Sequence, residues 1–369
     1  MTVSDLDDPR RWPSAIVAPF DEAARAVAAE TQADADAHDA RVRAWLRDAV
    51  RARDGARLAR SFANAPTPAL ARHLRRLLAA IEREGSSPAD GLVTTLFAIP
   101  VIVVAAQRTK AAAVTLDAVL PDVAALAAIL RDANALGGCE TFALSSSLVF
   151  VDAIDVAALP ALLAENETRA GALDLAPAAI RVEGDDERVH LRFVVGAALT
   201  APAVDPMRES SIARWGMPFA QALGRALAAP DVILLALPRD AQRLVVAVQT
   251  GRAAQREVSA QLFAGNAIRR FRASYGEPTA IISSHVADDA PGGGELRLSL
   301  SSPFAPKAAE GFRCLLYPYE TVQEVAGMLE ALLTDCRVTD VRVVTGVHDD
   351  LDTLTGGRLF FKDHGPTTH

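Results

Sequence analysis

The stretch from Val232 to Gln249, "VILLALPRDAQRLVVAVQ", decides how the middle of this chain is interpreted. It holds two short apolar runs, "VILLALP" and "RLVVAVQ", with the polar connection "RDAQ" between them. Short apolar runs bounded by turn residues are typical of buried strands. The pattern therefore predicts two buried strands that follow each other directly.

The segments on either side extend this pair into a larger unit. Upstream, "RVHLRFVVG" alternates like a half-buried strand, and "MPFAQALGRALAAP" has helical periodicity. Downstream, "REVSAQLFAGNAIRRFRASYG" predicts a long helix and "TAIISSHVA" a further strand. The order from Glu187 to Val286 is then β-α-β-β-α-β. This order predicts a ferredoxin-like unit, residues 187–290, with one antiparallel sheet and both helices on one side.

The C-terminal part, residues 291–369, predicts a ββαβ unit with a terminal hairpin. "GELRLSLSSP" and "FRCLLYPY" are typical of strands, and "VTDVRVV" of a strand that returns after a helix. That helix, "TVQEVAGMLEALLTDC", has the clearest signal in the chain, because Thr321 and Glu324 have the spacing of a capping box.

Residues 1–88 predict a helical segment, and residues 89–186 a first β-α-β unit. Apolar residues recur at steps of three and four on both sides of "NAPTP", which predicts a helical hairpin. The apolar run Gly91–Ala106 contains Pro100 and is shorter than the roughly twenty residues of a membrane helix, so it predicts a strand. The whole chain is therefore expected to be an α+β protein with antiparallel or mixed sheets.

The composition is that of a globular protein of a reducing compartment. Half of the residues are hydrophobic and 23% are charged. Cys139, Cys314 and Cys336 are widely spaced and odd in number, which favours reduced, buried thiols. The N-terminus is acidic and lacks the basic and apolar regions of a signal peptide. We therefore expect a cytoplasmic protein with no membrane partner.

Three passages, "AIPVIVVAAQR", "NAIRRFRASYGEPTAIISSH" and "DCRVTDVRVV", resemble a family of uncharacterised β-proteobacterial proteins of unknown function, as does the helical N-terminus. The resemblance covers most of the chain and is one of layout. It implies the fold and a cytosolic bacterial setting, and it implies no activity. Where that family has a segment with paired cysteines, this chain has "GVHDDLDTLTGG" and no cysteine.

The stretch "GVHDDLDTLTGGRLFFKDHG", Gly346–Gly365, is the first candidate site. His348 and Asp350 could converge on one face of a strand, because alternate residues share a face. The spacing fits neither a calcium loop nor a zinc motif, and Gly356–Gly357 suits the turn of a hairpin. We therefore expect no metal and no other cofactor, and keep His348 and Asp350 as weak metal candidates.

The second candidate is "IISSHVADD", which holds Ser283, Ser284, His285 and Asp288. Ser283 and His285 share a strand face, as a nucleophile and its base must. The sequence contains no GxSxG elbow and no glycine-rich phosphate loop. The pattern therefore favours an ordinary strand that ends in a turn, and the catalytic residues of any enzyme stay unknown.

The third candidate is a basic helix face. Between Arg41 and Arg83, eleven arginines stand against three acidic residues, in a chain whose net charge is −8. Arg43, Arg47 and Arg51 recur every four residues opposite an apolar stripe. Such a face is either solvated, docked on the acidic remainder of the chain, or bound by a protein partner. A nucleic-acid partner is least favoured, because no aromatic residues interleave with the arginines.

These observations favour a non-enzymatic binding, scaffold or regulatory protein, whose partner is another protein or a second copy of the chain. One alternative is a hydrolase or transferase with a site assembled from scattered residues. Another is a subunit that contacts a larger assembly through the basic helical hairpin. A deep pocket that gathers His285, Arg208 or the Asp349 region would favour an enzyme, and a broad or groove-like surface would favour a binding protein.

Overall fold

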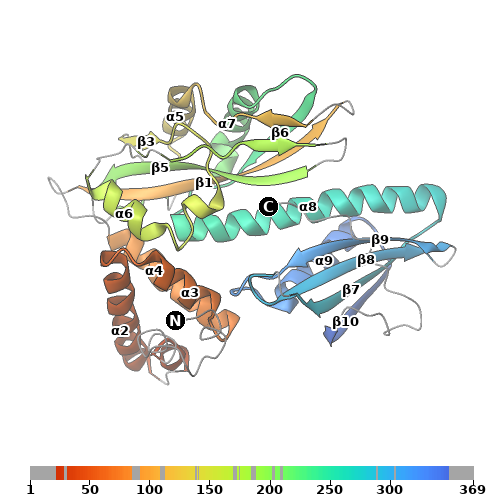
Figure 1. Cartoon of the computed structure of the whole chain (residues 1–369), viewed down its shortest axis with the longest axis horizontal. Helices are drawn as coiled ribbons and strands as arrows, with labels where there is room; N and C mark the ends of the chain where they lie inside the picture. Colours follow the sequence, from red (N-terminus) through yellow and green to blue (C-terminus); the bar gives the residue numbers. More distant parts are fainter. Residues whose placement is uncertain are drawn as a thin grey trace. The chain divides into compact units, whose positions relative to one another are not determined.

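The structure is a computed structural model that describes residues 22–28, 31–84, 92–108, 113–137, 139, 141–168, 173, 175–183, 188–201, 204–207, 211–287, 290–302 and 305–348. It combines helices with mostly antiparallel sheets and has a helical N-terminal region, as the sequence predicts (Figure 1). Within those ranges, no helix has both the length and the apolar character that crossing a membrane requires. The chain divides into two compact units, Met1–Phe62 with Arg72–Gln255, and Ala63–Ala71 with Arg256–His369.

The N-terminal helices are α2 (Gln32–Arg51), α3 (Gly55–Ala63) and α4 (Pro68–Glu84). The first of them begins after Thr31, whose side chain accepts a hydrogen bond from the backbone N–H of Asp34. It ends where Arg53 adopts a left-handed conformation with φ of 55°. That break starts α3, a helix that the sequence does not predict, so residues 32–84 form three helices where the sequence predicts a hairpin of two.

The first unit contains a four-stranded sheet in which all neighbouring strands are antiparallel. Its strand order is β3-β5-β1-β6, with β1 (Val93–Gln107), β3 (Phe142–Leu144), β5 (Arg188–Thr200) and β6 (Val232–Pro238). The central pair runs from Val93 opposite Thr200 to Ala105 opposite Arg188. This long pairing places β1 and β5 at the centre of the sheet, and β6 lies at one edge.

Helices cover both faces of this sheet (Figure 1). The remaining elements of the unit are β2 (Val114–Leu116), α5 (Val123–Asp132), η3 (Val151–Ala153), α6 (Leu159–Thr168), β4 (Ile180–Val182), α7 (Ile212–Ala226) and the first part of α8 (Leu244–Ser274). On one face, Trp215 and Phe219 of α7 share a core with Leu130 of α5. On the other face, a Cβ added at Gly251 of α8 would lie 3.0 Å from Leu191 Cδ1, so the glycine lets α8 approach the sheet.

The second apolar run of the Val232–Gln249 stretch is helical, so the strand predicted there is wrong. The helix α8 begins at Leu244, inside that run. Leu244, Val245 and Val248 are all buried, because the start of the helix is covered on several sides. In such a segment the polar stripe that reveals a helix is missing, and a short apolar run then cannot be told from a buried strand.

This helix also changes the topology, because the sheet predicted over Glu187–Val286 does not form. The strands β5 and β6 belong to the first sheet, whereas β7 (Thr279–Val286) belongs to another. When β2, η3, α6 and β4 are set aside, the elements of Val93–Pro238 follow the order β1-α5-β3-β5-α7-β6, which is β-α-β-β-α-β.

The second unit contains a sheet with the order β10-β7-β8-β9. Its later elements are β8 (Gly294–Ser302), β9 (Ala305–Leu315), α9 (Val322–Asp335) and β10 (Asp340–His348). The order agrees with the prediction, but β9 begins before the strand predicted at "FRCLLYPY" and ends at Leu315. Phe271 of α8 and Leu329 of α9 share one core with Leu298 of β8, so both helices cover the same face. The capping box of Thr321 and Glu324 is confirmed. The predicted terminal hairpin lies outside the described residues.

Candidate functional sites

The serine–histidine candidate lies on β7, and the two side chains are bonded. Ser283 Oγ is 2.8 Å from His285 Nε2, which is the distance of a nucleophile from its base. Ser283 is only 1% exposed and His285 5%, so a substrate has no access to the hydroxyl in this structure. Asp288 and Arg208 lie outside the described residues. The pair therefore has the geometry of a catalytic dyad without the access that a dyad needs.

A polar layer that the sequence analysis missed surrounds this pair. Ser283 lies opposite Arg297 in the sheet, and Arg297 lies opposite Arg313 on the next strand. Both arginines donate to the carboxylate of Glu295, each from Nε at 2.5 Å, and Glu295 is fully buried. The alternation in "GELRLSLS" places Glu295 and Arg297 on one face, a signal that could have revealed the layer. Two guanidinium groups compensate one buried carboxylate here, as stable burial of a charge requires.

The C-terminal metal candidates are only partly described. In the parallel pairing of β10 with β7, His348 is the register partner of His285. The side chain of His348, and all of Asp350, lie outside the described residues. Among the described residues, no three side chains of histidine, cysteine, aspartate or glutamate converge to hold a metal ion. The expectation of no metal at His348 and Asp350 stays a prediction.

The three arginines of the basic face do not share one environment. Arg43 and Arg47 are half-buried on α2, and Arg51 is exposed in its last turn. Neighbouring arginines make cation–π contacts within the same unit. The guanidinium of Arg57 lies 4.5 Å from the centre of the Trp45 ring, and that of Arg75 lies over the Phe62 ring. These contacts favour the interpretation that the positively charged helix face packs against the chain itself.

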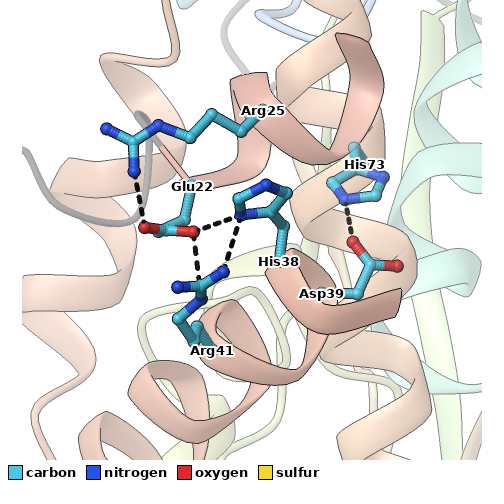
Figure 2. Close-up of polar contacts among 6 residues, drawn as sticks. All are labelled: Glu22, Arg25, His38, Asp39, Arg41 and His73. Atoms are coloured by element: carbon cyan, nitrogen blue, oxygen red, sulfur yellow. Dashed lines mark hydrogen bonds and ion pairs between the residues drawn. The ribbon is translucent and has the colours of Figure 1, made fainter. Parts of the chain in front are cut away.

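Figure 2 shows the hydrogen bonds and ion pairs through which carboxylates and histidines hold the N-terminal helices together. Glu22 accepts a hydrogen bond from His38 Nδ1 at 2.6 Å and is also paired with Arg25 and Arg41. The hydrogen bond from His38, assisted by both arginines, holds the pKa of Glu22 below its ordinary value. Glu22 is thereby joined to α2 through residues that are distant from it in the sequence.

A second histidine ties α2 to α4. His73 Nε2 lies 2.7 Å from Asp39 Oδ1 (Figure 2). On the other side of the ring, a guanidinium nitrogen of Arg76 lies 2.6 Å from His73 Nδ1. Because Arg76 can only donate, Nδ1 accepts and Nε2 donates its hydrogen to Asp39. The ring is 7% exposed. These contacts give the helical region a defined packing, and they offer no open site for a ligand.

The edge strand β6 exposes two large apolar side chains that are neighbours on one face of the strand. Ile233 is 57% exposed and Leu235 is 54% exposed, on the face of β6 that α7 does not cover. The sequence predicts a buried strand here, which is wrong for this face because β6 lies at the end of the sheet. The strand Val232–Pro238 contains no charged residue. Natural edge strands usually carry charges, bulges or covers that prevent pairing with another chain.

The hydrogen bonds that bracket β6 reveal which backbone groups face outward. Arg108 donates its N–H to the carbonyl of Asp231, and Arg239 donates to the carbonyl of Pro100, both at 2.8 Å. These bonds to β1 lie at odd-numbered residues of the β6 segment. In an antiparallel ladder, successive residues bond alternately to the two neighbouring strands.

The even-numbered residues of β6 therefore point their backbone groups away from β1. On that side no described strand pairs with β6, since it ends the strand order. The N–H of Val232 lies 3.4 Å from the Ala229 carbonyl, a weak turn contact. The outward donors that remain are the N–H groups of Leu234 and Ala236, and the outward carbonyls are those of Val232, Leu234, Ala236 and Pro238.

A groove of about 300 Å³ lies between α5 and α7. It is lined mainly by alanine and leucine, with Asp122 and Arg225 as its charged residues. Asp122 already accepts a hydrogen bond from the backbone N–H of Ala125 at the start of α5. The groove thus offers an apolar surface with little polar chemistry left to orient a ligand.

No protein-family model, no curated protein and no solved structure matches this chain. The resemblance to uncharacterised β-proteobacterial proteins therefore stays a prediction, and the function has to be argued from the sites themselves.

Proposed function

We propose that this chain is a non-enzymatic binding protein whose docking surface is the open edge of β6. The observation that carries the proposal is the combination of exposed Ile233 and Leu235 with outward-facing backbone groups in an uncharged strand. A strand added to such an edge gains main-chain hydrogen bonds and covers apolar side chains at the same time.

The scaffold supports this role because it holds the edge rigidly. Pairing with β1 fixes β6 from Val232 to Pro238, and α7 packs against its other face. The order β1-α5-β3-β5-α7-β6 is that of a ferredoxin-like arrangement, and we propose that fold for the first unit. A preformed edge lowers the ordering cost that a partner strand must overcome on binding.

A hydrolase is the second candidate, and the Ser283–His285 contact is the observation in its favour. Burial of both side chains argues against it, because an acyl group must reach the serine oxygen and an oxyanion site beside it. The third candidate, a subunit that uses Arg43, Arg47 and Arg51 as its contact, is weakened by the half-buried positions of the first two.

Site-specific photo-cross-linking tests the proposal. A photoreactive amino acid at Leu235 of the full chain should give a discrete adduct of defined mass in the cells that produce the protein. The same residue at Met217, which is 71% exposed on α7, should give none. Equal yields at both positions, or no adduct at Leu235, would refute the docking surface.

A further inference from the structure

We infer that the partner at the β6 edge is a second copy of this chain, paired antiparallel through β6 with Leu234 opposite its counterpart. The inference rests on the proposed function and names the occupant of the same edge. In a two-fold symmetric dimer both copies contribute the same surface to the interface. The strand must therefore be complementary to a second copy of itself that runs in the opposite direction.

Side chains support self-pairing because every position of the strand is apolar. In the inferred register, Ile233 faces Leu235 of the partner copy on the exposed side, and this contact occurs twice. No charge opposes another, since Val232–Pro238 contains none. A foreign partner of defined identity would be selected by charges or hydrogen-bonding side chains, and β6 offers neither.

The exposed side chains select between two possible registers. If Leu235 faced its own copy, Leu234 would bond reciprocally to Ala236 of the partner copy, and Ile233 would face the less exposed Leu237. If Leu234 faces its own copy, its N–H and C=O bond reciprocally, and the N–H of Ala236 reaches the carbonyl of Val232 across the axis. Both registers form four main-chain hydrogen bonds, but only the second places the most exposed side chains of the strand, Ile233 and Leu235, against each other.

The expected dimer is weak to moderate in affinity. Pairing of one strand buries less than the roughly 800 Å² per partner of a standard stable interface. The net charge of −8 adds a repulsion between copies that salt reduces. We therefore expect dissociation in the micromolar range, with tighter association at higher ionic strength.

Charge variants of the full chain test the partner and the register together by analytical ultracentrifugation. The variant with Ile233→Lys and Leu235→Lys should be monomeric at concentrations where the wild type is dimeric, because lysines would face each other across the edge. The variant with Ile233→Lys and Leu235→Glu should regain dimerisation, because each lysine then faces a glutamate of the partner copy. Met217→Lys is the matched control, with one exposed apolar residue replaced away from the edge.

The outcomes separate the inference from the proposed function. A wild type that stays monomeric at high micromolar concentration overturns self-pairing, whereas a cross-link at Leu235 to a protein of another mass would leave the docking surface intact. A Lys/Glu variant that stays monomeric while the wild type dimerises overturns the Leu234-centred register. Loss of dimerisation in Met217→Lys places the interface elsewhere and overturns the inference.

Discussion

The carboxyl group of Glu82, in α4, accepts a hydrogen bond at Oε1 from the backbone N–H of Val245 at 3.3 Å, at the start of α8. Glu82 is 4% exposed, and burial raises its pKa to about 8, although the Val245 N–H and the charge of Arg243 act in the opposite direction. The first turn of a helix has unpaired N–H groups, and a side chain from another helix satisfies one of them here.

This contact predicts a loss of stability at alkaline pH. The folded chain holds the Glu82 proton more tightly than the unfolded chain, whose ordinary pKa is 4.5, so the free energy of unfolding falls as pH rises from there to about 8. A tenfold difference in proton affinity between the two states corresponds to about 1.4 kcal/mol, which makes the full effect on the order of a few kcal/mol. Glu82→Gln, which resembles the protonated acid, should flatten the dependence measured by urea unfolding at several pH values.

The exposed Glu330→Gln on α9 is the control for that experiment. It should leave the pH dependence of the wild type unchanged. A Glu82→Gln variant that loses stability between pH 5 and pH 8 as steeply as the wild type would contradict the assignment.

Replacing Arg192 should lower the free energy of unfolding strongly, because its buried guanidinium donates hydrogen bonds to three carbonyl groups. It donates to the carbonyls of Ala178, Ala179 and Leu191, and it lies 4.0 Å from the centre of the Phe150 ring. Replacing it by methionine leaves those carbonyls without their donor, and we expect a loss of about 3 kcal/mol in the free energy of unfolding.

The control for Arg192 lies on the same strand. Arg188 is exposed, and its replacement by methionine should cost about 0.5 kcal/mol or less. Equal losses in the two variants would show that burial of Arg192 does not govern its contribution.

We expect the hydroxyl of Ser283 to be unreactive in the folded chain. Its 1% exposure should prevent reaction with a fluorophosphonate probe, even though His285 Nε2 is 2.8 Å away. Mass spectrometry after incubation of the native protein is the measurement. A covalent adduct on Ser283 that disappears in His285→Ala would instead favour the hydrolase.

Removing the charges of the basic helix face should have a small effect on the free energy of unfolding and no effect on self-association. Replacing Arg43, Arg47 and Arg51 by glutamine should lower the free energy of unfolding by about 1 kcal/mol, because Arg51 is exposed, Arg43 and Arg47 are only half-buried, and solvent-screened helix charges contribute little. Dimerisation through β6 should persist in ultracentrifugation. A triple variant that is well folded but monomeric would show that the dimer interface lies in the helical region and not at β6.

Particular elements explain how much of the fold the sequence could predict. The helix α9 was predictable because its capping box and its apolar stripe are both local signals. The start of α8 was not, because Leu244 and its neighbours are buried by segments distant in the chain. One misassigned strand then moved the predicted sheet boundary, since strand order depends on every element between the strands.

The candidate sites were predictable to a lesser degree. Neighbours on one strand, such as Ser283 and His285, could be placed on one face from their spacing alone. Glu295 and Arg313 belong to other strands, and the sheet register that brings them together is a tertiary property. Exposure of Ile233 depends on β6 being an edge, which no local pattern encodes.

Amide hydrogen exchange along β6, followed by NMR at two protein concentrations, distinguishes an edge that pairs with a second copy from an edge that stays free. The N–H groups of Ile233 and Leu235 bond to β1 and should be protected at both concentrations. Those of Leu234 and Ala236 face the open edge, and we expect fast exchange in the dilute monomer and protection in the concentrated dimer. Exchange at Leu234 and Ala236 that is equally fast at both concentrations would contradict pairing through β6.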